Sequence, residues 1–307
     1  AADGMQRAGG LRARGGLSAA IYGREGRSIF AAMGILFVIG LSVCFWAESQ
    51  GNPALADIGL DQAMGSMEGK EVRFGIAQSA MFTTVTTSFT TGTVNNMHDT
   101  LTPLGGMIPM LLMMLGEVVF GGVGCGLYGM LAFAILAVFI AGLMVGRTPE
   151  FLGKKIEPYE MKWSVLVCLA TPIAILVGSG LAAVVPSVMD SLHNGGAHGF
   201  SEMLYAYSSC GGNNGSAFAG FNANTVFLNV SLGLMMLFAR FLPIIGTLAI
   251  AGSLAGKKKI ATTAGTLSTT NGMFVFLLIV VVLLIGALSF FPALALGPLA
   301  EFFGSIA

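Results

Sequence analysis

The chain alternates between long apolar stretches and shorter polar ones. Its apolar segments fall at about 29–47, 104–146, 163–188, 225–254 and 271–300. Two runs, 163–188 and 261–300, contain no Asp, Glu, Lys or Arg. A bilayer core needs about 20 apolar residues per helix, so both runs are long enough to span. Since one chain holds several such runs, the pattern predicts an all-α integral membrane protein rather than a soluble protein with wholly buried helices.

The segment 104–146 is too long for one straight span. A glycine cluster interrupts it, made of Gly121, Gly122, Gly124 and Gly126. We predict a broken or strongly bent helix, because irregular backbone at membrane depth occurs only where protein or a watery cavity covers it. Close helix packing through Gly122-x-x-x-Gly126 is the alternative, and the two do not exclude each other.

Basic residues gather at one set of segment ends. If each segment crosses once, residues 1–28, 147–162 and 255–270 share one side, and they hold twelve of the fifteen Lys and Arg residues. The remaining three are Lys70, Arg73 and Arg240. The positive-inside rule then places the first set in the cytoplasm.

Composition excludes several functions. The sequence is 55% hydrophobic and 10% charged with no net charge, so it offers no basic surface for nucleic acid. The scattered cysteines predict neither a disulfide framework nor a zinc site; they are Cys44, Cys125, Cys168 and Cys210. Residues 1–20 lack the apolar core of a secretory signal. The lysine run 257–259 is first a topology signal and second a contact for lipid headgroups or a cytoplasmic partner.

Each outer loop, 48–103 and 189–224, holds a short apolar run followed by a polar turn that contains glycine. The runs are 76–87 and 201–207, and the turns are 88–94 and 208–217. About ten apolar residues are too few to span a bilayer and suit a re-entrant helix. A loop folded over the membrane surface is the alternative.

The two outer loops align at a constant offset of 123 residues. The offset pairs Phe82 with Tyr205, Thr86 with Ser209, Gly92 with Gly215, Thr93 with Ser216, and Glu117 with Arg240. Both copies are predicted to contain an outer helix, a re-entrant helix, a polar turn and a long interrupted inner helix. Repeats of this kind line the substrate path in transporters. Chance similarity between apolar segments is the alternative.

The polar turns place hydroxyl and amide side chains around a glycine. Backbone carbonyls and Thr or Ser oxygens can replace the water around a cation, and glycine permits the dihedral angles that this requires. Neither turn contains a carboxylate. A weakly hydrated monovalent cation is therefore expected rather than calcium or magnesium.

Glu117 and Arg240 are charged residues inside long apolar segments. Charged groups deep in a membrane face a cavity or each other, so we hypothesise that these two form, or alternately break, an ion pair near the permeation path. A purely structural bridge is the alternative. His98 and Asp99 follow the first turn, where they either attract cations or make loop hydrogen bonds. The methionine-rich stretch 107–114 is interpreted as packing.

Several sequence motifs resemble the A subunit of Kdp-type potassium-transporting ATPases over about residues 25–305. They are NP at 52–53, MEGKEVRFG at 67–75, MHD at 97–99, GEVVFGGVG at 116–124, GLMVGRTPE at 142–150, NNGSAFAG at 213–220 and ALALGP at 293–298. The resemblance implies a potassium-channel-like fold of four helix–pore helix–helix repeats around a selectivity filter.

This sequence holds two such repeats. Residues 29–147 resemble the third repeat of the family and 163–256 the fourth, joined by a cytoplasmic loop at 148–162. A C-terminal transmembrane helix follows at 271–300, and the cytoplasmic segment 1–28 matches poorly. By this resemblance we expect the first two repeats to be absent from this sequence, and a complete filter to require a second copy or a separate N-terminal half.

The resemblance also implies roles for individual residues. Thr90, Thr91, Gly92 and Thr93 match the third filter strand, and Asn213, Asn214, Gly215 and Ser216 match the fourth. The first polar turn, which matches the third filter strand, contains Thr90-Thr91-Gly92 where the family pattern predicts a Ser-Cys-Gly-like sequence. Its backbone carbonyls can still bind the ion. The charged family positions on the inner helices correspond to Glu117, Arg147 and Arg240.

The implied function is potassium binding and translocation in the bacterial inner membrane. The implied partners are a P-type ATPase catalytic (B) subunit, an accessory C subunit, a small single-helix subunit and membrane lipid. The chain has neither a G-x-x-x-x-G-K-[ST] nor an Asp-Lys-Thr-Gly motif, so it is not expected to bind nucleotide or hydrolyse ATP. The alternatives are a stand-alone channel-like potassium symporter and an inactive scaffold fragment. An enzyme is less favoured, because His193 and His198 show no obvious metal-ligand partners in the sequence.

Overall fold

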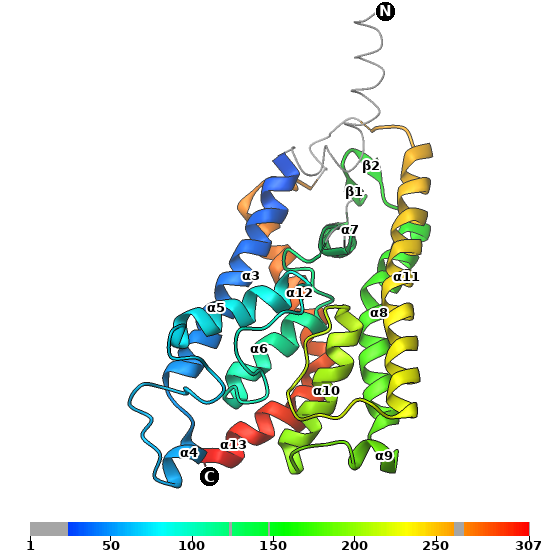
Figure 1. Ribbon diagram of the computed structural model, residues 1–307. Coiled ribbons are helices and arrows are strands. Elements are labelled where there is room, and N and C mark those ends of the chain that lie inside the picture. The colour runs from blue at the N-terminus through cyan, green and yellow to red at the C-terminus, as the bar shows by residue number, and fades with distance from the viewer. Residues whose placement is uncertain (1–23, 123–124, 147, 261–266, 307) are drawn as a thin grey trace, which may run out of the picture.

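A computed structural model describes residues 24–122, 125–146, 148–260 and 267–306 of the chain. Helices make up nearly all of its regular structure (Figure 1). The elements in chain order are α3 (Arg24–Ser49), α4 (Pro53–Asp57), α5 (Gly75–Ser88), α6 (Pro103–Met114), α7 (Cys125–Val145), β1 (Glu150–Phe151), β2 (Lys154–Lys155), α8 (Pro158–Ala182), α9 (Pro186–Met189), α10 (Gly196–Gly212), α11 (Val226–Gly256), α12 (Gly272–Leu294), the π-helix η1 (Ala295–Leu299) and α13 (Ala300–Ile306).

Five helical stretches within the described residues are long and apolar enough to cross a bilayer. They contain α3, α7, α8, α11 and α12, one for each apolar segment of the sequence. Two of them begin where a side chain caps the helix: Thr225 accepts a hydrogen bond from the Leu228 amide, and Asn271 accepts one from the Phe274 amide. The prediction of an all-α integral membrane protein is confirmed.

The ends of these helices are arranged as the distribution of basic residues predicts. The start of α3, the β1–β2 hairpin, the end of α11 and the start of α12 all lie at one end of the molecule, at the top of Figure 1. At the opposite end lie α4, α9 and α13. The lysines of the hairpin and of the α11 terminus therefore share one side.

The predicted break within 104–146 separates α6 from α7. Four of its described residues have positive φ angles: Gly116 (79°), Glu117 (50°), Phe120 (64°) and Gly121 (70°). A Cβ atom added to Gly121 would overlap the backbone of Gly126, so the glycines also allow a close approach of the backbone. Figure 1 looks nearly along the axis of α7, whereas α8 and α11 run in the plane of the picture, so α7 crosses them steeply.

The inner helix of the second copy differs from the prediction. We expected it to be interrupted, but α11 continues for 31 residues. At the offset of 123, the positions that match the glycines of the first break are Ala239, Ile244, Ile245, Thr247 and Ala249. These side chains disfavour the left-handed backbone of the first break, so the helix does not unwind. It also tolerates Pro243, whose carbonyl accepts a hydrogen bond from the Thr247 hydroxyl.

The two short helices pack into the bundle, α10 more completely than α5, whose Met81 and Phe82 are exposed. With 14 residues in α5 and 17 in α10, each falls short of a full span. The second, α10, packs against α6, α8, α11 and η1, and its residues from Ser201 to Ser209 are all buried. Burial of this kind fits re-entrant helices and argues against a loop lying on the membrane surface.

The methionine-rich stretch contributes to the same core. Met110, Met113 and Met114 on α6 are at most 1% exposed and pack with Tyr205 and Tyr207 of α10. Their interpretation as packing residues is confirmed. Beyond α12 the predicted C-terminal helix is bent: η1, which contains Pro298, leads into α13, and both contact α10.

Candidate ion-binding turns

The first polar turn begins at the C-terminal end of α5. Thr90 and Gly92 have φ angles of 56° and 78°. The Thr91 amide donates to the carbonyl of Thr86 at 3.0 Å, and the Thr86 hydroxyl donates to the carbonyl of Thr93 at 2.6 Å. A buried threonine of the helix therefore holds both ends of the turn.

The second polar turn begins at the C-terminal end of α10 and has the same geometry. Asn213 and Gly215 have φ angles of 64° and 86°. The Asn214 amide donates to the carbonyl of Ser209 at 3.1 Å, and the Ser209 hydroxyl donates to Asn214 Oδ1 at 3.0 Å. The offset of 123 residues thus joins positions with the same sign of φ and the same backbone hydrogen bond.

In both turns, residues with positive φ alternate with residues without it. Among the described residues Thr91, Thr93, Asn214 and Ser216 all lack a positive φ. Alternation of this kind can direct successive carbonyl oxygens to one side of a strand, which is how backbone carbonyls line ion filters. Glycine supplies one of the two left-handed positions in each turn.

The two turns lie against each other. A Cβ atom built on Gly92 would overlap the carbonyl oxygen of Asn214. Thr91, Thr93 and Gly215 are exposed, whereas Thr86 and Ser216 are buried. Each turn therefore has one open side and one side fixed to the protein.

Glu117 lies beneath the second turn, in the break between α6 and α7. Its side chain accepts a hydrogen bond from Asn214 Nδ2 at 2.7 Å, and the residue is 1% exposed. Its other oxygen, Oε2, is buried without a hydrogen-bond partner among the described residues. The hypothesised ion pair between Glu117 and Arg240 is not formed in this structure, because the carboxylate is directed to the asparagine of the turn.

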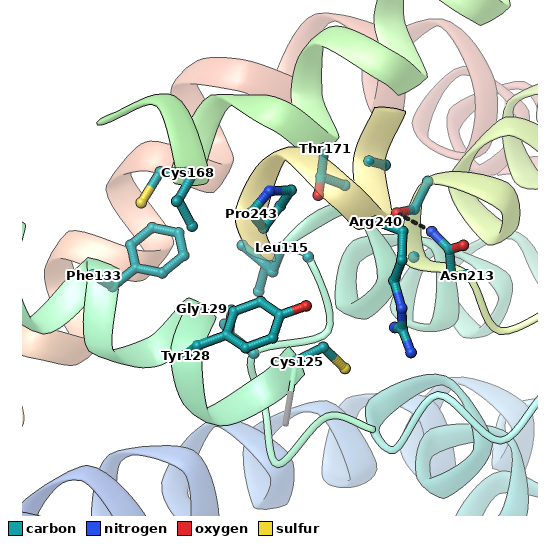
Figure 2. A pocket seen from close by; sticks show the side chains of 16 residues that line it. Leu115, Cys125, Tyr128, Gly129, Phe133, Cys168, Thr171, Asn213, Arg240 and Pro243 are labelled. Carbon is teal, nitrogen blue, oxygen red and sulfur yellow. Dashed lines mark hydrogen bonds between the residues drawn. The ribbon is translucent and has the colours of Figure 1, made fainter. Parts of the chain in front are cut away.

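Arg240 extends from α11 into a cavity of about 40 Å³. Figure 2 shows its side chain between Asn213 and Cys125, with Tyr128 and Thr171 also on the cavity wall. One water needs about 10–15 Å³ of such space, so the cavity holds a small number of waters at most. The second predicted basic residue, Arg147, lies outside the described residues.

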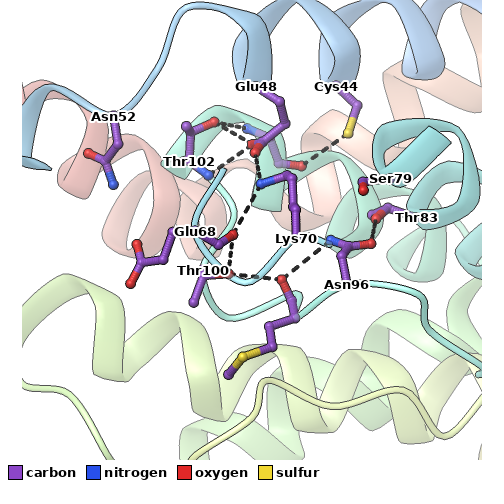
Figure 3. A network of polar contacts seen from close by, with 12 residues as sticks. Cys44, Glu48, Asn52, Glu68, Lys70, Ser79, Thr83, Asn96, Thr100 and Thr102 are labelled. Carbon is purple, nitrogen blue, oxygen red and sulfur yellow. Dashed lines mark hydrogen bonds and ion pairs between the residues drawn. The ribbon is translucent and has the colours of Figure 1, made fainter. Parts of the chain in front are cut away.

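A buried ion pair supports the chain that follows the first turn (Figure 3). Lys70 Nζ lies 2.6 Å from Glu48 Oε2, and both side chains are fully buried. Glu48 Oε1 accepts hydrogen bonds from the Thr102 amide at 2.9 Å and its hydroxyl at 2.7 Å. Sequence reasoning missed this network, although an acidic residue at the end of an apolar segment was a usable signal.

His98 and Asp99 make loop hydrogen bonds in this structure. His98 is buried and its Nδ1 lies 2.6 Å from the Tyr205 hydroxyl. Asp99 Oδ1 lies 3.0 Å from His198 Nε2, and Glu301 Oε1 lies 2.8 Å from His198 Nδ1. The structure thus favours the loop-bond alternative over a cation-attracting one.

The expectation that His198 has no ligand-type neighbours is wrong. Its ring lies near Asp99 and Glu202, which are distant in sequence, and one ligand atom from each of the three falls within 4.8 Å of the others. Protein donors already occupy these groups, because Glu202 accepts hydrogen bonds from the backbone amides of His193 and Asn194. Burial lowers the pKa of His198, but the hydrogen bonds and charges of Asp99 and Glu301 outweigh it and raise the pKa to about 10.

Comparison with known proteins identifies the family. The family model described as potassium-transporting ATPase A subunit matches residues 18–303. A potassium-transporting ATPase potassium-binding subunit of Clostridium botulinum (strain Alaska E43) is 68% identical over 286 residues, which cover 91% of this chain and 49% of the relative. Proteins of the same name from Clostridium perfringens and Desulfovibrio desulfuricans are 66% and 62% identical, over 92% and 91% of this chain and 50% and 49% of the relatives.

The chain spans about half the length of the curated relatives that it matches. The match nevertheless covers nearly all of this chain, including both polar turns, the break between α6 and α7, and α12. On this evidence the chain belongs to the potassium-transporting ATPase A subunit family.

Proposed function

We propose that the chain supplies two turns of a potassium-selective filter on the extracytoplasmic side of a bacterial inner membrane. The observation that carries the proposal is the paired geometry of residues 90–93 and 213–216, which alternate in the sign of φ and lie in contact. Both turns follow the C-terminal end of a short helix, whose dipole adds partial negative charge near a bound cation.

Several features of the turns suit potassium. Neither turn carries a carboxylate, so an ion there is held by neutral oxygens, which favours a weakly hydrated monovalent cation. The relatives bear the name potassium-binding subunit, in agreement with this chemistry. Glu117 lies on the inner side of the second turn, where its Oε1 accepts a hydrogen bond from Asn214 Nδ2 and holds that side chain in place.

The chain acts within a larger complex in this proposal. A ring of four turns surrounds the ion, and residues 90–93 and 213–216 supply two of them. A P-type ATPase catalytic subunit, with an accessory subunit and a small single-helix subunit, hydrolyses ATP. The present chain binds and passes the ion without binding nucleotide.

Potassium-limited growth of a transport-deficient bacterium tests the proposal. The chain is expressed with the catalytic and accessory subunits, either alone or together with a separate N-terminal half. Growth that requires the added half, and that Gly92→Asp or Gly215→Asp abolishes, supports two functional half-filter turns. The aspartates place a charged side chain where the structure has a bare backbone.

Membrane insertion of every variant is verified in parallel. If no combination supports growth although the chain is inserted, the proposal fails and a scaffold role remains. Potassium uptake by the chain without any ATPase subunit would instead favour a stand-alone symporter.

A further inference from the structure

A chain of hydrogen bonds runs behind the second turn. His98 Nδ1 lies 2.6 Å from the Tyr205 hydroxyl, which lies 2.8 Å from the Ser216 hydroxyl. The Ser216 hydroxyl donates to Asn214 Oδ1 at 2.7 Å, and Asn214 Nδ2 donates to Glu117 Oε1 at 2.7 Å. This hydrogen-bond chain therefore connects the loop after the first turn, helix α10, the second turn and the α6–α7 break.

The direction of every bond in this chain can be deduced. The backbone amide of Ser216 also donates to Asn214 Oδ1, at 2.7 Å. This bond fixes the orientation of the Asn214 side-chain amide, with its oxygen towards Ser216. Because the Ser216 hydroxyl gives its single proton to Asn214, it accepts from Tyr205. Tyr205 has then used its own proton, so it accepts from His98, which must carry its proton on Nδ1.

All donors consequently point the same way, from His98 towards the Glu117 carboxylate. His98 and Tyr205 are 0% exposed, Glu117 is 1% and Ser216 is 4% exposed. Hydrogen bonds aligned in a dry environment polarise one another and become stronger than isolated ones. An amide such as Asn214 does not readily pass a proton along. The hydrogen-bond chain therefore fixes the position of the second turn rather than conducting protons.

We infer that Tyr205 and His98 are positioning residues that determine ion specificity through the second turn. The inference rests on the proposed function. A turn fixed from behind resists moving inward around a cation smaller than potassium, so sodium is left with poorly placed oxygens. Without the Tyr205 hydroxyl, the bond from His98 to the turn is lost and the turn can adapt to sodium.

The Tyr205→Phe variant tests this inference because it removes one hydroxyl and keeps the ring. The ring remains stacked on Phe218, whose centroid lies 4.2 Å away. The chain is assembled with its N-terminal half and the ATPase subunits, and ATPase activity is measured against potassium and against sodium. We expect the ratio of half-maximal sodium to potassium concentrations to fall about tenfold, the equivalent of about 1.4 kcal/mol.

Tyr207→Phe is the matched control on the same helix. Its hydroxyl is hydrogen-bonded to Ser231 at 2.8 Å, away from the turn, and the ratio should stay unchanged. A second pair of variants probes the His98 end of the hydrogen-bond chain. His98→Asn places an amide donor near the position of Nδ1 and should retain more discrimination than His98→Leu, which has no donor.

The outcomes separate the two proposals. If the unmodified assembly does not respond to potassium, the proposed function fails and this inference falls with it. If potassium stimulates the assembly but Tyr205→Phe changes the ratio no more than Tyr207→Phe, only the positioning role is overturned. Should Tyr205→Phe not assemble, equal ratios for His98→Asn and His98→Leu overturn it in the same way.

Discussion

Gly92 of the first turn faces the carbonyl oxygen of Asn214 in the second turn so closely that no Cβ atom fits between them. The two residues are 122 positions apart, and their contact brings the ends of α5 and α10 together. Gly215 has a similar positive φ angle, 86° against 78°, but nothing lies within 4 Å of a Cβ built on it. Both glycines therefore meet a requirement for positive φ, and only Gly92 also meets a requirement for space.

Alanine substitution at the two glycines should have unequal effects. An L-residue in the left-handed region costs about 1–2 kcal/mol, so Gly215→Ala should lower the free energy of unfolding by roughly that amount. Gly92→Ala carries the same cost and in addition pushes against the Asn214 backbone, so it should be more destabilising. Thermal unfolding of the purified assembly in detergent, with and without potassium, measures both. Equal losses in the two variants would mean that the turns do not touch.

Sequence reasoning predicted the spanning helices, the side on which basic residues gather and the first break, because each leaves a local signal. A run of apolar residues, a group of lysines or a glycine cluster suffices for such a prediction. The repeat offset also located both turns correctly, although it predicted a break in α11 that the residues at 239, 244 and 245 do not permit.

The partners of individual polar residues could not be read from the sequence. His198 meets Asp99 and Glu301, which lie 99 and 103 positions away, and Glu117 meets Asn214 rather than Arg240. Such pairs depend on how helices cross and how far a side chain reaches. The pattern of polar residues gives their depth in the membrane but not the direction in which each side chain points.

The buried ion pair between Glu48 and Lys70 should show strong coupling. Removing one partner leaves a buried charge without compensation and typically costs about 3–5 kcal/mol. Lys70→Met and Glu48→Gln should each cause a loss of this size in the free energy of unfolding. The double variant should recover most of it, because the glutamine oxygen can still accept from Thr102.

A double-mutant cycle measures this coupling directly. Arg73→Met with Glu71→Gln is the comparison cycle, since that ion pair is 2.6 Å long but its side chains are 71% and 55% exposed. Exposed pairs contribute about 0–1 kcal/mol, so the comparison cycle should show little coupling. Coupling of similar size in both cycles would contradict the role assigned to burial.

His198 should make stability depend on pH in the alkaline range. Its pKa of about 10 in the folded chain lies above the ordinary value of 6.5, so its charge stabilises the folded state fully below about pH 6.5. This stabilisation is lost as pH rises through 10. The side chain is 22% exposed, so solvent reduces the effect to roughly 2–4 kcal/mol.

The measurement compares the unmodified chain with His198→Gln between pH 7 and pH 10. Tyrosines, lysines and cysteines also titrate there, but they do so in both proteins and cancel in the difference. The difference in unfolding free energy should be largest near pH 7 and shrink towards pH 10. A difference that stays constant over this range would show that His198 carries no proton-linked stability.

Lys257 should fix the C-terminal end of α11 against α8. Its Nζ atom lies 2.7 Å from Glu160 Oε2 and 2.9 Å from Glu157 Oε2, and it donates to the carbonyl of Lys155 at 3.1 Å. The Glu160 side chain is fully buried, so Lys257→Gln leaves its carboxylate without the cation and should cost about 2 kcal/mol.

Lys258→Gln removes the same charge from an exposed neighbour and should change stability by less than about 0.5 kcal/mol. Hydrogen exchange at the Ile156 amide, which donates to the carbonyl of Pro149, should quicken only in Lys257→Gln. Equal acceleration in both variants would assign the effect to the number of positive charges on that side rather than to the contact with Glu160.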